Sequence, residues 1–160
     1  MRILGIDPGL STAGLGFLHI GPKRTVVETD WLTIKTPSVL PLEERLFELH
    51  ENLTEYLEET KPDLAVVEQL FFATNKRTAM DTSAARGVIL VTLRKHDIPI
   101  LSATPLQLKM TITGDGTADK KQVQEMVKRI LKLDQIPSPP DAADALALAL
   151  FGAYSKRAIS

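Results

Sequence analysis

The sequence predicts an α/β fold in which helices flank a mixed five-stranded sheet. Three short apolar segments follow one another across brief links at the start of the chain. After them, strand-like apolar segments alternate with longer amphipathic segments of helical period. The chain has 160 residues, the length of one ordinary domain, so we expect residues 1–160 to form a single domain.

The first three strands are expected at residues 2–7, 13–20 and 24–36. The first is the apolar stretch RILGID, and Pro8-Gly9 directly after it interrupts any regular element. The second and third are joined at Gly21-Pro22, a turn-forming pair. Because both links are short, the three strands are predicted to be antiparallel neighbours.

Helices and strands then alternate. Pro41 opens a helix whose leucines recur at helical spacing, and residues 63–69 (DLAVVEQ) have the composition of a buried strand. A second helix is predicted from about Asn75 to His96, followed by a fifth strand at residues 98–103.

Three helices are predicted to complete the chain, at residues 106–110, at residues 119–133 and from Ser138 onward. The last contains ALALALF, which alternates as a half-buried strand would. Alanine and leucine favour helix, however, and Ser138-Pro139 provides an N-cap followed by proline at the first helical position. We therefore predict a helix, with Asp141 and Asp144 three residues apart on one face.

Composition excludes several classes of protein. Apolar residues make up 44% of the chain and charged residues 24%, which is typical of a globular protein. The chain has no cysteine, so disulfides and thiolate metal sites are excluded, and its three histidines show no ligand spacing. Without a membrane-length apolar run or an N-terminal signal pattern, we expect a soluble, cytoplasmic protein.

Charge is unevenly distributed along the chain. Residues 1–67 carry 6 basic and 11 acidic side chains, whereas residues 68–160 carry 13 basic and 9 acidic ones. The net charge of −1 argues against a nucleic-acid partner, but the basic second part is typical of a surface that binds phosphates. Solvated helix faces would explain the same pattern equally well.

Four acidic residues at the ends of apolar segments are the candidate site. They are Asp7, Glu68, Asp141 and Asp144. A buried carboxylate needs a positive partner, and hard cations such as Mg²⁺ prefer oxygen ligands. Taken singly, each acid has a simpler explanation: a turn before proline, an edge ion pair, or a favourable charge in the first turn of a helix. Together they predict metal-dependent phosphoryl chemistry.

The order of elements resembles the ribonuclease H-like architecture, and five motifs make the resemblance closer. LGIDPG, VVEQLFF, AARGV, QLKMTITGDGTADKKQV and DAADALALAL together resemble the RuvC family of Holliday junction resolvases. The match extends over essentially the whole chain. It implies an endonuclease that nicks four-way DNA junctions symmetrically in recombination and repair, leaving a 5′-phosphate and a 3′-hydroxyl.

The resemblance also implies a metal site. Asp7, Glu68, Asp141 and Asp144 match the family's metal-binding catalytic acids, which use two Mg²⁺ ions, with Mn²⁺ as a substitute. Asp7 would bridge the ions, Glu68 and Asp144 would complete their coordination, and Asp141 would bind or orient water.

Further residues are matched to DNA contacts and catalysis. Lys109 and Lys120 flank the glycine-containing loop TITGDGTAD, and we expect at least one of them to stabilise charge in the transition state. Phe71 matches an aromatic residue that contacts the junction, where it could stack on unpaired bases. Lys121 is expected to contact the DNA backbone. Three basic or polar neighbours of Phe71 are expected to line the same DNA-binding groove: Asn75, Lys76 and Arg77.

The expected partners are a second copy of the chain and DNA. Small residues in the second helix, among them Ala79, Ser83, Ala84 and Gly87, permit the close helix approach of a two-fold dimer. They would equally allow that helix to pack on the sheet. The resemblance implies the homodimer, and it leaves open a RuvA–RuvB-type branch-migration complex as a further partner.

Other functions remain open from the sequence. The chain could be a ribonuclease H-like nuclease with another nucleic-acid substrate, or a junction-binding protein that does not cleave. A nucleotide-binding protein of the actin and Hsp70 kind also begins with an apolar strand and Asp-x-Gly, but that class needs two such domains and a longer chain.

Overall fold

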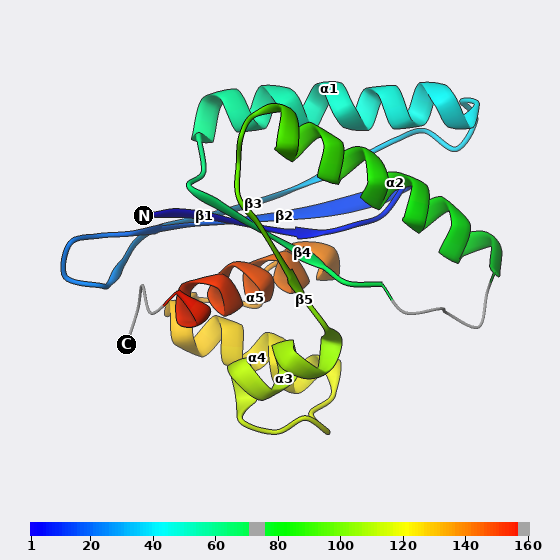
Figure 1. Ribbon diagram of the computed structural model, residues 1–160. Helices are drawn as coiled ribbons and strands as arrows, with labels where there is room; N and C mark the ends of the chain where they lie inside the picture. Colours follow the sequence, from blue (N-terminus) through cyan, green and yellow to red (C-terminus); the bar gives the residue numbers. More distant parts are fainter. Residues whose placement is uncertain (71–75, 157–160) are drawn as a thin grey trace.

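A five-stranded mixed sheet separates two layers of helices (Figure 1). The computed structural model describes residues 1–70 and 76–156. The strands follow the order β3-β2-β1-β4-β5 across the sheet. Their bounds are β1 Arg2–Asp7, β2 Thr12–Ile20, β3 Val26–Lys35, β4 Leu64–Glu68 and β5 Ile100–Ala103. The predicted mixed five-stranded sheet is confirmed.

Strand directions bring two carboxyl ends together. As predicted, β1, β2 and β3 are antiparallel neighbours, whereas β4 pairs with β1 in parallel and β5 with β4 in parallel. Neighbouring parallel strands have their carboxyl ends on the same side of a sheet. The last residues of β1 and β4, Asp7 and Glu68, therefore lie side by side.

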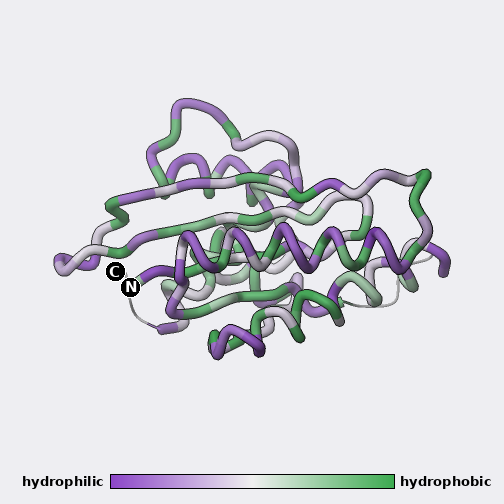
Figure 2. Tube along the Cα trace, turned by 90° about the horizontal axis from the view of Figure 1, so that it is seen from above, coloured by the Kyte–Doolittle hydropathy of each residue, from purple (hydrophilic) through white to green (hydrophobic). Residues whose placement is uncertain are grey.

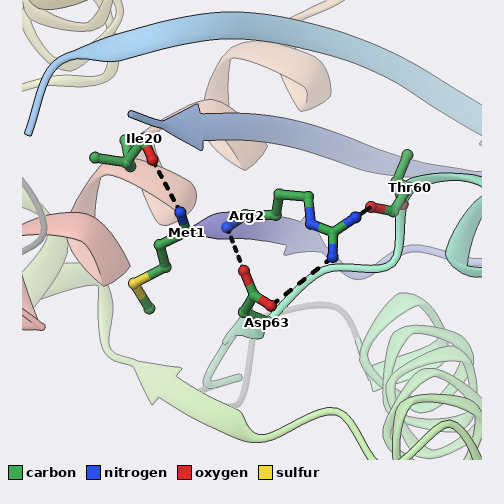
Figure 3. Close-up of polar contacts among 5 residues, drawn as sticks. All are labelled: Met1, Arg2, Ile20, Thr60 and Asp63. Carbon is green, nitrogen blue, oxygen red and sulfur yellow. Dashed lines mark hydrogen bonds and ion pairs between the residues drawn. The ribbon is translucent and has the colours of Figure 1, made fainter. Parts of the chain in front are cut away.

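Polar contacts at the amino-terminal end of β1 hold this strand in register with its neighbours (Figure 3). The Met1 amino group donates to the Ile20 carbonyl at 2.8 Å. The Arg2 backbone N–H donates to the Asp63 carboxylate at 2.6 Å, and the Arg2 guanidinium reaches the Thr60 carbonyl at 3.2 Å. A one-residue slip of β1 would turn every side chain of the strand to the other face of the sheet. These contacts therefore help to determine which residues lie at the carboxyl end of β1.

Helices cover both faces of the sheet. On one face, α1 (Leu42–Thr60) and α2 (Lys76–Lys95) enclose one apolar core. The view from above shows α1 alternating between hydrophilic and hydrophobic segments, as an amphipathic helix does (Figure 2). On the other face lie α3 (Pro105–Thr113), α4 (Lys120–Leu131) and α5 (Pro140–Ser155), around a second core. No helix in residues 1–70 or 76–156 is long and apolar enough to cross a membrane.

The last helix, α5, is buried along nearly its whole length between the sheet and α3 and α4. The predicted helix over ALALALF is confirmed. A half-buried strand would need one face toward solvent, whereas this segment has apolar neighbours all round. The prediction that Ser138 is the N-cap is wrong: the helix begins at Pro140 and its N-cap is Pro139. Pro140 suits the first helical position because its missing N–H would be unpaired there in any case.

Candidate active site

Three carboxylates from different elements meet in one cavity at the carboxyl ends of β1 and β4. Ile6 pairs with Val67 across β1 and β4, so the residues that follow, Asp7 and Glu68, are neighbours. Asp144, in the second turn of α5, lines the same cavity. The cavity has a volume of about 340 Å³. The predicted convergence of Asp7, Glu68 and Asp144 is therefore present in the structure.

Asp141 lies beside this group but does not line the cavity. Its backbone carbonyl packs directly over Gly14, the residue that pairs with Asp7 across β1 and β2. A Cβ atom at Gly14 would collide with that carbonyl, so glycine permits the close approach of the first turn of α5. Asp141 is close enough to raise the pKa of Asp7.

The cavity's basic side chains come from helices that begin with the same local motif. Lys109 lies in α3 and Lys120 is the first residue of α4. Thr104 caps α3 and Asp119 caps α4, each in a capping box completed by a glutamine. The two lysines, which flank TITGDGTAD in the sequence, both line the cavity.

Burial and mutual repulsion disfavour the charged forms of the acids. Burial, followed by the charges of Glu68, Asp144 and Asp141, raises the pKa of Asp7 from 3.8 to about 8. Burial and Asp144 also raise the pKa of Glu68, although a hydrogen bond with Asp7 opposes this rise. Burial and the neighbouring acids together favour the protonated form of Asp7 when no cation is bound.

Lys120 relieves part of the same charge. Its Nζ lies 2.8 Å from Asp144 Oδ2, in a partly buried pair whose Asp144 side chain is 24% exposed. The hydrogen bond with Asp144 raises the pKa of Lys120. Burial raises the pKa of Asp144, and the bond from Lys120 opposes that rise. The ammonium group thus supplies positive charge where the carboxylates are most crowded.

The donor set fits a hard divalent cation. Asp7, Glu68 and Asp144 offer only carboxylate oxygens, the ligands that Mg²⁺ prefers, and an ion would offset the burial and repulsion that raise their pKa values. In the part of the chain that the structure describes, however, no three acidic or histidine side chains are gathered closely enough to form a metal site. Mg²⁺ usually keeps several waters and is held by one or two carboxylates, which this set of acids can provide.

The remaining predicted contact residues lie outside the cavity. Lys76 and Arg77 are exposed at the start of α2, and Lys121 is exposed in the first turn of α4. In Figure 1, α2 begins on the same side of the molecule as the carboxyl end of β4. Phe71 and Asn75 lie outside the described residues.

Arg86 is a site residue that the sequence did not reveal as one. Its Nε donates to the Glu68 carbonyl at 2.9 Å, and its Nη2 lies 3.4 Å from Ser102 Oγ on β5. It therefore ties α2 to the ends of β4 and β5 and positions the backbone that carries Glu68. The motif AARGV contains this arginine, but nothing in the local sequence shows which carbonyl it contacts.

The sequence profile of the family described as crossover junction endodeoxyribonuclease RuvC matches residues 3–151. The chain belongs to this family. It is therefore a nuclease, and RuvC family nucleases depend on metal ions.

Individual relatives agree over nearly the whole chain. The crossover junction endodeoxyribonuclease RuvC of Thermotoga petrophila is 43% identical over 99% of this chain and 95% of its own. The RuvC structure from Thermus thermophilus has a TM-score of 0.88 and 34% identity, covering 98% of this chain and 96% of its own. A second structure of that protein, in complex with a Holliday junction substrate, has a TM-score of 0.88 and 33% identity, over 98% and 95%. The predicted ribonuclease H-like fold is confirmed.

The raised pKa of Asp7 predicts how stability depends on pH without metal. Between pH 4 and 8 the folded protein holds a proton on Asp7 that the unfolded chain has released, so the free energy of unfolding should fall as pH rises through this range. Asp7→Asn should remove much of this fall and stabilise the protein at pH 8 by roughly 2–4 kcal/mol. Urea unfolding in chelator measures both effects.

The matched control for this experiment is Asp134→Asn, the same change at an exposed position. It should leave the pH dependence as it is. Equal slopes for wild type and Asp7→Asn would contradict the raised pKa.

Removing the contact from Arg86 to the Glu68 carbonyl should lower the affinity for metal, although Arg86 is not itself a candidate ligand. Arg86→Met removes the donor to the Glu68 carbonyl, and loss of such supporting contacts lowers metal affinity or activity by roughly 10- to 100-fold. Calorimetric titration with Mg²⁺ would measure the affinity directly. Arg94→Met, on the exposed face of the same helix, should change it less than about twofold; equal losses in both variants would contradict a positioning role.

Proposed function

We propose that this protein resolves four-way DNA junctions by paired symmetric nicks in recombination and repair. The observation that carries the proposal is the cavity where Asp7, Glu68 and Asp144 meet Lys109 and Lys120. Support for the substrate comes from the Thermus thermophilus relative, which has been seen in complex with a Holliday junction. We expect the protein to act in the cytoplasm as a single nuclease domain, residues 1–160.

The proposed chemistry is hydrolysis that leaves a 5′-phosphate and a 3′-hydroxyl. Asp7, Glu68, Asp141 and Asp144 would hold two Mg²⁺ ions, or Mn²⁺ in their place. Such ions activate water and neutralise charge on the phosphodiester. Lys109 and Lys120 would place positive charge against the reacting phosphate. Lys120 would turn from Asp144 to the phosphate once a cation has taken over the charge of that carboxylate.

DNA would approach the layer formed by α3 and α4. The acidic helix α1 lies across the sheet from them, so its carboxylates face away from a polyanion bound there (Figure 1). Lys121 would contact the backbone beside the cavity, and Lys76 and Arg77 would do so from the start of α2. We propose the same region for Phe71 and Asn75.

A second copy of the chain is the proposed partner in symmetric cutting, because a junction presents two equivalent strands. An apolar groove of about 610 Å³ between α1 and α2 supports this interface. Phe47 and Val91 are 58% and 61% exposed there, and an added Cβ at Gly87 would meet no atom within 4 Å. Open space over α2 at Gly87, among the described residues, would allow the close approach of a second copy. A RuvA–RuvB-type complex is proposed as a further partner from the family resemblance.

Cleavage of a synthetic mobile junction tests the function. With Mg²⁺, wild type should produce symmetric paired nicks, chelator should abolish them, and Asp7→Asn should reduce them at least about 100-fold through loss of a metal ligand. Asp134→Asn is the control. Tight binding without nicks would indicate a non-cleaving junction protein, and equal cutting of an RNA–DNA hybrid competitor would indicate another substrate.

The dimer makes a separate prediction. Val91→Asp places a charge in the proposed interface and should convert the dimer to monomers in analytical ultracentrifugation, because a charge desolvated without a partner is costly. Val39→Asp makes the same change at a position that is 89% exposed and outside the groove, and should leave the dimer intact. A dimer that persists in Val91→Asp would place the interface elsewhere.

A further inference from the structure

A second cavity, of about 300 Å³, lies where the free edge of the sheet meets α1. Its lining includes four consecutive residues of β3, residues 32–35. Successive residues of a strand point to opposite faces, so a cavity that touches all four reaches the strand's edge. Among the described residues, β3 is the terminal strand of the sheet and pairs only with β2, so one side of its ten residues has no strand partner there.

One face of α1 forms the opposite wall. It contributes residues at helical spacing, Asn52, Glu55, Tyr56 and Glu59. The Tyr56 side chain is only 8% exposed, and its hydroxyl has no hydrogen-bond partner among the described residues. A buried hydroxyl without a partner is destabilising by about 1–3 kcal/mol. A group that entered the cavity would pair with this oxygen, and remove the cost, once the side chains that cover the hydroxyl moved aside.

The charge around the cavity is predominantly negative. Glu55 and Glu59 line it, and alternation along β3 turns Glu28 and Asp30 to the same face as Ile34, toward α1. Burial, and then the charges of Asp30, Glu59 and Glu28, raise the pKa of the Tyr56 hydroxyl. Lys35 is the one basic residue in the described lining. Such a surface repels DNA and attracts cationic side chains.

We propose that the edge of β3 and the adjoining face of α1 form a docking surface for a basic, extended segment of a partner protein. The segment adds to the sheet as a sixth strand through backbone hydrogen bonds. Its lysine or arginine side chains lie against the acidic face, and one of them enters the cavity beside Tyr56. None of the described residues that line this cavity also lines the nuclease cavity, so a partner bound here leaves the DNA site open.

The test uses an acetylated heptapeptide of alternating lysine and valine, titrated into the full chain in a calorimeter. Hydrogen exchange of the β3 amides measures strand addition in the same mixture. We expect binding, slower exchange along β3, and no binding of a peptide with glutamate in place of lysine. Peptide binding should leave junction cleavage unchanged, so the outcome is independent of the proposed nuclease function.

Two double variants of α1 separate the docking surface from general attraction. Glu55→Gln with Glu59→Gln should weaken peptide binding roughly fivefold, the loss expected for two ion pairs. Glu51→Gln with Glu58→Gln removes the same charge from exposed positions outside the cavity lining and should weaken binding less than about twofold. Equal losses in both would overturn the proposal in favour of non-specific attraction.

Tyr56→Phe tests the buried hydroxyl alone. Loss of one hydrogen bond should weaken peptide binding by roughly threefold or more. Unchanged affinity would overturn the entry of a side chain beside Tyr56. No binding at millimolar peptide, or binding without slower exchange in β3, would overturn the docking surface as a whole.

Discussion

The close contact between α5 and the first two strands is the constraint on which the site depends. Gly5 and Gly16 face the middle of α5, where a Cβ on either strand would collide with the helix backbone around Ala145. Without side chains at these positions, the helix lies directly on the sheet and its first two turns reach the end of β1. Asp144 thereby comes from a distant part of the sequence to the cavity that Asp7 and Glu68 line. A helix displaced outward by even one methyl group would separate these carboxylates.

Bringing acids together in this way is electrostatically unfavourable, and the protein offsets the cost with groups of its own. Asp7 and Glu68 share a hydrogen bond, which requires a proton, and Lys120 neutralises Asp144. These measures offset only part of the negative charge of the site, to which Asp141 also contributes. Such a site folds without a metal ion and keeps carboxylate oxygens of the kind that hard cations prefer, which suits a metal-dependent nuclease of the RuvC family.

Much of this arrangement follows from the sequence, and the parts that do not are non-local. Apolar runs interrupted by Pro8-Gly9 and Gly21-Pro22 indicated the strands, and parallel pairing of β1 with β4 then brought Asp7 to Glu68. The pairing of Lys120 with Asp144 and the bond from Arg86 to the Glu68 carbonyl join segments far apart in the chain, so no local pattern encodes them. At Ser138 the local pattern was misleading, because two successive prolines moved the start of the helix beyond it.

The capping boxes at the starts of α3 and α4 have a consequence for the entropy of substrate binding. Thr104 with Gln107, and Asp119 with Gln122, satisfy backbone donors that would otherwise need solvent or a ligand. The backbones of Lys109 and Lys120 are consequently ordered before DNA arrives. Binding then restricts only their side chains, at up to about 2 kcal/mol each, and avoids the further 1–2 kcal/mol per residue of ordering a flexible loop. At the proposed contacts between these lysines and phosphate, more of the attraction would then be left to hold the substrate.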